Sequence, residues 1–155
     1  MNTLIRTALH LPMAALLSAG VLADPSVAGK DVPFHGSVEG VYTSAPGVQP
    51  ATFSASGVAS HIGHFTFAWQ GEVTPDASGA LGSVEFTAAN ADKIYGEFSG
   101  VATLIAPPMI WIEEDVTITG GTGRFADATG HLLMQRSIDI TTDVSSGSFD
   151  GVIVK

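Results

Sequence analysis

Two charged residues stand where the sequence pattern otherwise places apolar side chains. Glu114 interrupts an alternation of apolar residues that runs from Ile110 to Ile118, and Arg136 interrupts a second one from Leu132 to Ile140. Alternate residues of a strand share a face, so each charge is predicted to point the same way as its apolar neighbours. Because an isolated buried charge is very costly, we expect the two to form an ion pair.

The pairing follows from one hairpin register. If Ile118 lies opposite Leu132, then Glu114 lies opposite Arg136, at the distance of a cross-strand pair. Three interpretations of the pair stay open: a salt bridge that fixes the strand register, the floor of a ligand cavity, or a feature of an outer, subunit-facing surface. The second interpretation predicts a ligand-binding site that also contains two tyrosines as hydrogen-bond donors and two aromatic residues of one strand face. Its candidate residues are Glu114, Arg136, Tyr42, Tyr95, Phe67 and Trp69.

Other kinds of site find little support in the sequence. His61 and His64 are three residues apart and should face opposite sides of a strand, so no metal site is expected. Gly120, Gly121 and Gly123 predict a tight turn rather than a phosphate-binding loop, because no Lys-Ser/Thr follows them. No nucleophile elbow of the G-x-S-x-G type occurs. We therefore assign no catalytic residue and expect no cofactor.

The elements that must position the candidate site are strands. Period-two runs recur between turn-forming residues, and no sustained helical periodicity is found after the N-terminal segment. Eight consecutive strands with short links predict an all-β, antiparallel, up-and-down, calycin-like barrel, whose closure removes the sheet edges; a sandwich is the alternative. The predicted strands span residues 34–43, 52–60, 62–73, 80–88, 93–104, 110–119, 130–141 and 147–154.

Residues 1–23 are predicted to be a signal peptide, followed by an extension at 24–33 and the barrel at 34–155. Arg6 precedes a short apolar run that Pro12 and Gly20 interrupt, and a membrane span needs about 20 apolar residues. Cleavage is expected before Asp24, with a cut after Ala28 as the alternative. The protein should then be secreted or periplasmic.

The predicted mature chain is strongly acidic. It carries fifteen acidic and five basic side chains, a formal charge of −10, which disfavours nucleic acid and anionic lipid as partners. We expect no membrane insertion. The sequence contains no cysteine, so the domain holds together without disulfides and has no thiol chemistry.

Residues 113–130, which read EEDVTITGGTGRFADATG, resemble the ITGGTGxFxxAxG stretch of allene oxide cyclase-like and dirigent-like barrels. Residues 55–65, 87–100 and 149–151 resemble small secreted bacterial proteins with that barrel. The resemblance implies an eight-stranded barrel, trimeric in the plant members, which act without metal or organic cofactor. Those members confine a reactive hydrophobic intermediate and steer its ring closure or coupling.

Three hypotheses about function follow. The first is an exported, non-enzymatic barrel that binds a small hydrophobic molecule or serves as an envelope module. The second is a cofactor-independent cyclase or isomerase that acts on a hydrophobic substrate inside the barrel. The third is a structural surface protein that forms oligomers through an apolar outer face.

Overall fold

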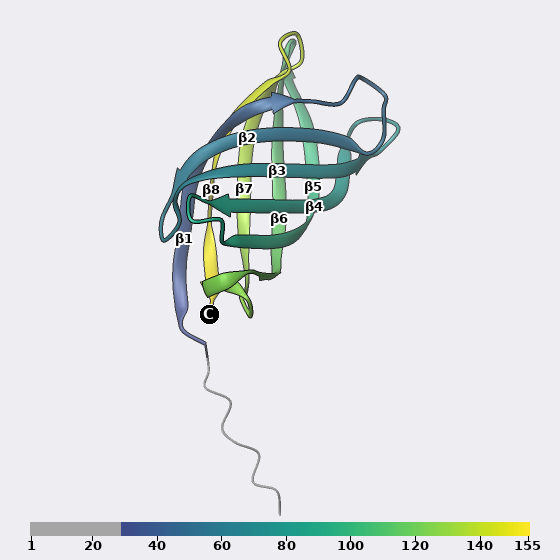
Figure 1. The fold of residues 1–155 in the computed structure, drawn as a ribbon. Helices are drawn as coiled ribbons and strands as arrows, with labels where there is room; N and C mark the ends of the chain where they lie inside the picture. The colour runs from purple at the N-terminus through teal and green to yellow at the C-terminus, as the bar shows by residue number, and fades with distance from the viewer. Residues whose placement is uncertain (1–28) are drawn as a thin grey trace, which may run out of the picture.

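The computed structural model describes residues 29–155. The predicted signal peptide lies outside the described residues, as does the beginning of the predicted extension. The described chain forms one closed barrel of eight antiparallel strands in sequence order, with a single short helix (Figure 1). Its elements are β1 (Asp31–Tyr42), β2 (Ala51–Ala59), β3 (Gly63–Val73), β4 (Gly79–Ala88), β5 (Lys93–Ala106), β6 (Met109–Gly121), η1 (Gly123–Phe125), β7 (Thr129–Asp139) and β8 (Val144–Val154).

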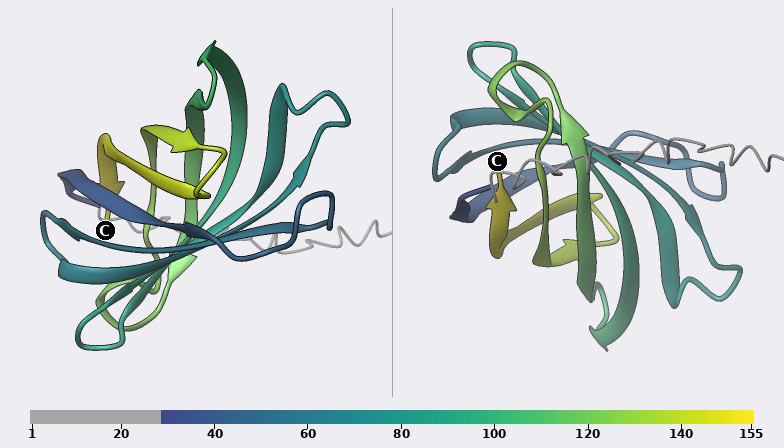
Figure 2. Two further views of the ribbon diagram at one scale, coloured as in Figure 1. Left: turned by 90° about the horizontal axis from the view of Figure 1, so that it is seen from above. Right: turned by 90° about the horizontal axis from the view of Figure 1, so that it is seen from below.

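The up-and-down barrel predicted from the sequence is confirmed. Every predicted strand is present with its ends within three residues of the expected positions, and β8 pairs with β1 along nearly its whole length. This pairing closes the sheet and leaves no free edge, which the alternative sandwich would have kept. The two views in Figure 2 show the strands curving around a common interior.

Glycine within the strands allows this strong curvature. Gly57 of β2 faces the carbonyl oxygen of Ser37 on β1 so closely that a Cβ atom would overlap it. Phe65 of β3 lies against the same position from inside the barrel. A side chain at residue 57 would therefore push two strands apart.

The barrel has two different ends. The turns at residues 60–62 and 89–92, the segment 122–128 and both ends of the described chain lie at what we call the closed end (Figure 1). Phe125 and Ala128 are buried there. The turns at residues 43–50, 74–78, 107–108 and 140–143 lie at the opposite, open end.

Aromatic side chains fill the half of the interior nearer the closed end. Phe86 is fully buried, and its ring lies 4.8–5.6 Å, centroid to centroid, from four other phenylalanine rings. The four neighbours are Phe34, Phe65, Phe67 and Phe149. Rings at such separations in tilted and edge-to-face arrangements form a well-packed core. This half of the barrel is therefore solid.

Two expected interior residues are exposed. Leu104 and Ile140 share the inner-face periodicity of their strands, but they are 59% and 51% exposed. Both lie where the chain runs past the open end of the barrel, so no opposite wall covers them. No helix among the described residues has the length and apolar character to cross a membrane.

Candidate functional site

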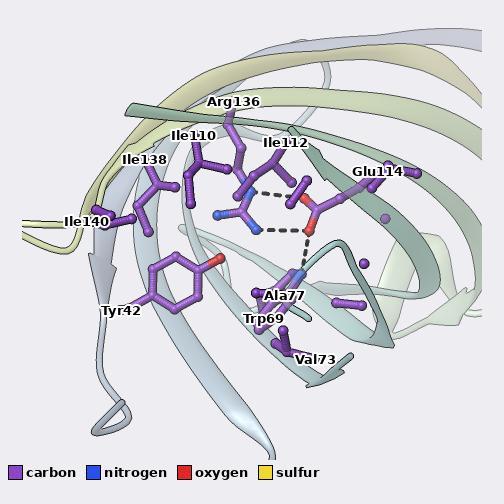
Figure 3. A pocket seen from close by; sticks show the side chains of 15 residues that line it. Tyr42, Trp69, Val73, Ala77, Ile110, Ile112, Glu114, Arg136, Ile138 and Ile140 are labelled. Carbon is purple, nitrogen blue, oxygen red and sulfur yellow. Dashed lines mark hydrogen bonds and ion pairs between the residues drawn. The ribbon is translucent and has the colours of Figure 1, made fainter. Parts of the chain in front are cut away.

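Glu114 of β6 and Arg136 of β7 form a buried ion pair inside the barrel. The guanidinium donates from Nε to Oε2 of Glu114 and from Nη2 to Oε1, each over 2.9 Å. Trp69 of β3 donates from Nε1 to Oε1 of the same carboxylate over 2.8 Å, as Figure 3 shows. Ser145 of β8 accepts a 3.2 Å hydrogen bond from Nη1 of the arginine. Four strands thus hold one bidentate pair in place.

The pair compensates the cost of its own burial. Glu114 and Arg136 are each only 1% exposed, and no buried polar side-chain atom in residues 29–155 lacks a hydrogen-bond partner. Burial lowers the pKa of Arg136, but the hydrogen bonds and the charge of Glu114 outweigh that effect, so that its pKa is raised overall. The arginine is therefore a permanent cation whose charge is matched by its carboxylate partner.

Aromatic rings surround the guanidinium on its remaining sides. The Cζ atom of Arg136 lies 4.8 Å from the ring centroid of Phe53, 5.5 Å from that of Tyr42 and 5.6 Å from that of Trp69. Rings at these distances attract a desolvated cation through their π faces. Phe53 was missed in the sequence analysis, although it alternates with Ala51 and Ala55 on an inward face of β2.

The expected contact between Glu114 and Arg136 is present, but the predicted register is wrong by two residues. Ile118 pairs with Gly130 rather than with Leu132, so Glu114 lies opposite Met134 and Arg136 lies opposite Ile112. Gly130 has a positive φ of 142°, and a Cβ atom there would overlap the carbonyl oxygen of Val152 on β8, so glycine suits this position. The charges meet diagonally across the strands, within reach of the long arginine side chain.

A cavity of about 180 Å³ lies next to the pair and opens at the open end of the barrel (Figure 3). The polar floor consists of Glu114, Arg136, Tyr42 and Trp69. The walls are almost entirely apolar and include Val73, Ala80, Ala102, Ile110, Ile112 and Ile138. A pocket for a whole drug-sized ligand usually measures about 300 Å³ or more, so this cavity is large enough for only part of such a molecule.

The guanidinium of Arg136 is almost inaccessible from the cavity, because the side chain is only 1% exposed. It carries five N–H bonds, of which Glu114 and Ser145 receive three. In Figure 3 the hydroxyl of Tyr42 points toward the guanidinium, beside the isoleucines of the wall. The floor can therefore offer the O–H of Tyr42, which is only partly buried, to an acceptor atom on a molecule in the cavity.

The other candidate residues are not at this floor. Tyr95 lies on the outer face of β5, because its neighbours Ile94 and Gly96 are buried and face inward, so its expected place in the interior site is wrong. Phe67 is buried among the phenylalanines of the closed half. Gly120 and Gly121 are the last residues of β6 and Gly123 is the first of η1, so the chain turns just after the first two glycines, at the closed end and away from the cavity.

Burial raises the pKa of Tyr42 above its ordinary value, and the charge of Arg136 only partly offsets this effect. A raised pKa in the folded state means that stability is fully present below the pKa of the unfolded tyrosine, about 10, and is lost as the pH rises through the folded pKa. Urea unfolding of the wild type should therefore show a loss of stability above about pH 10 that is smaller in Tyr42→Phe. Identical pH profiles for the two proteins would contradict this placement of Tyr42.

Comparison with known proteins finds similarity in structure and not in sequence. No protein-family model and no curated protein sequence matches the chain. The pterocarpan synthase dirigent protein GePTS1 superposes with a TM-score of 0.55 at 14% identity, over 83% of this chain and 86% of that one. The pterocarpan synthase dirigent protein PsPTS1 superposes with a TM-score of 0.57 at 12% identity, over 82% and 96%. At the level of fold, the chain is thus a dirigent-like β-barrel.

Proposed function

We propose that this protein binds a small, uncharged, mainly apolar molecule in the open end of its barrel. An oxygen of the ligand accepts a hydrogen bond from the hydroxyl of Tyr42, which is held beside the Arg136 guanidinium. The observation that carries the proposal is the apolar cavity of about 180 Å³ whose floor is a fully paired arginine.

The charge balance of the floor argues for a neutral ligand. Glu114 already neutralises Arg136 through two hydrogen bonds, and Trp69 holds the carboxylate from a third direction. A ligand carboxylate would add an unmatched negative charge beside Glu114, between apolar walls. A carbonyl or ether oxygen accepts the hydrogen bond from Tyr42 without that cost.

The size of the cavity indicates how much of a ligand it encloses. An engineered apolar cavity of about 150 Å³ in another protein takes up benzene. A space of about 180 Å³ therefore suits a single six-membered ring or a short alkyl segment with one polar atom. An open cavity of this size supports binding over a purely structural role.

Ring closure or isomerisation is the second candidate function. The fold neighbours are named as synthases, and here a carboxylate and a phenol line the same cavity.

Export from the cell is also part of the proposal. It rests on the N-terminal segment, and a mature protein that begins at Asp24, found by N-terminal sequencing, would support it.

Cyclohexanone and cyclohexanecarboxylate test the proposal, with thermal shift and native mass spectrometry as readouts. The ketone should bind the wild type, and the carboxylate should bind at least tenfold more weakly. Ala102 lies on the inner face opposite Ile112, and Thr103 lies on the outer face opposite Trp111. Ala102→Phe should abolish ketone binding by filling the cavity, whereas the adjacent Thr103→Phe should leave it intact.

Two results would overturn this assignment. One is tighter binding of the carboxylate than of the ketone, and the other is unchanged binding in Ala102→Phe. If candidate substrates with a ring-closable group leave the protein with altered structure, the second candidate function replaces the first.

A further inference from the structure

We infer that the natural ligand is elongated: its acceptor group lies at Tyr42, beside Arg136, and an uncharged apolar tail leaves the cavity along the inner face of β5 and β6 as far as Leu104. This inference rests on the proposed function. It concerns the part of the ligand that the cavity does not enclose.

The first argument is a continuous apolar track. Along β5, the inner-face positions Gly100, Ala102 and Leu104 lead from the floor to beyond the open end, and their partners on β6 are Glu114, Ile112 and Ile110. Ile138 of β7 lies beside Ile110 and continues the surface sideways. The track is about 13 Å long from residue 100 to residue 104, at about 3.3 Å per residue.

The second argument is the absence of charge along this hairpin. The sequence from Val101 to Ile112 contains no charged residue, although it includes the part of β5 that extends beyond its pairing with β4. Its tip exposes Leu104 and Ile105, and Ile140 is exposed on the neighbouring turn. Isolated exposed apolar residues are ordinary, but here they adjoin the opening of an apolar cavity.

The third argument is the distribution of charge between the two ends. Lys30, Lys93, Arg124 and Lys155, which are all the lysines and arginines of residues 29–155 except buried Arg136, lie at the closed end. The turns of the open end carry Asp76 and Asp143, and Asp139 ends β7 beside them. An anionic tail would meet only like charge there, so the emerging part of the ligand is apolar and uncharged.

A series of methyl ketones from pentan-2-one to undecan-2-one tests the inference by isothermal titration calorimetry. A fully buried methylene strengthens binding about fourfold, so one that is half covered by the track should strengthen it about twofold. Affinity should therefore continue to rise after the cavity is full, and it should level off once the chain reaches Leu104.

Leu104→Ser and Leu81→Ser form a matched pair of variants. The two leucines are 59% and 65% exposed, but Leu81 lies on the outer face of β4, opposite Ser99. Both variants should fold, because both side chains are largely exposed. Leu104→Ser should remove the gain for the long ketones and leave pentan-2-one unaffected, whereas Leu81→Ser should match the wild type throughout.

The outcomes separate this inference from the proposed function. If pentan-2-one binds but longer ketones bind no better, or if Leu104→Ser behaves like Leu81→Ser, the elongated ligand is wrong and the cavity remains a binding site. If no ketone of any length binds, the proposed function fails together with the inference.

Discussion

Glu114→Leu should lower the free energy of unfolding by about 3–5 kcal/mol, because it leaves the guanidinium of Arg136 buried without its counter-charge. Both side chains are 1% exposed, so water cannot solvate the remaining charge. A small domain has a total stability of about 5–15 kcal/mol, and the variant should therefore be only marginally folded. Urea unfolding at pH 7, followed by circular dichroism, measures the effect.

The double variant Glu114→Leu/Arg136→Met is the control for this prediction. Replacing a buried pair by apolar residues of similar volume is often tolerated, since no charge remains to be desolvated. Trp69 Nε1 and Ser145 Oγ would still lose their partners, at about 1–3 kcal/mol for an unsatisfied buried group. The double variant should thus be more stable than Glu114→Leu. A single variant within 1 kcal/mol of the wild type would show that the pair is not buried as described.

Phe86→Ala should lower the free energy of unfolding by about 3–5 kcal/mol, the range for removing a fully buried aromatic side chain. Phe86 has no exposed surface, and four phenylalanine rings surround it in the closed half. Backbone hydrogen bonding around the barrel limits how far these rings can collapse into the space left behind. The same unfolding measurement applies.

Leu133→Ala is the matched comparison for Phe86→Ala. Leu133 is exposed on β7, between Leu132 and Met134, which both face inward. Its removal should change stability by about 0.5 kcal/mol or less. Binding of cyclohexanone should persist in Phe86→Ala wherever the protein is folded, because Phe86 does not line the cavity. A loss of binding without a loss of stability would contradict the division of the barrel into a solid half and an open half.

The strands could be predicted from the sequence because the burial pattern of a strand depends on residues that are neighbours in the chain. Polar and apolar residues alternate along each run, and turn-forming residues separate the runs, so the eight strands could be placed within three residues of their ends. The same alternation identified Glu114 and Arg136 as inward-facing charges, because each breaks an otherwise apolar face. The alternation of side chains between the two faces of a strand was sufficient for that inference.

The register and the membership of the site depended on non-local contacts. A shift of the β6–β7 hairpin by two residues keeps every side chain on its face, so the pattern could not distinguish Leu132 from Gly130 as the partner of Ile118. Tyr95 was misplaced because both tyrosines were considered as donors, whereas the buried neighbours of Tyr95 direct it outward. Phe53 and Ser145 come from strands that no sequence argument linked to Arg136.

The sequence by itself thus determined the strands, their order, the inner and outer faces and the need for one buried ion pair. These properties follow from local chemistry: alternation, turn residues and the cost of an unpaired charge. The tertiary structure alone decided the hairpin register, the aromatic enclosure of Arg136, and the division into a solid closed half and a cavity of about 180 Å³ at the open end. The volume of a cavity is the volume that the closed wall encloses minus the volume of the side chains inside it. Only the assembled barrel defines the enclosed volume.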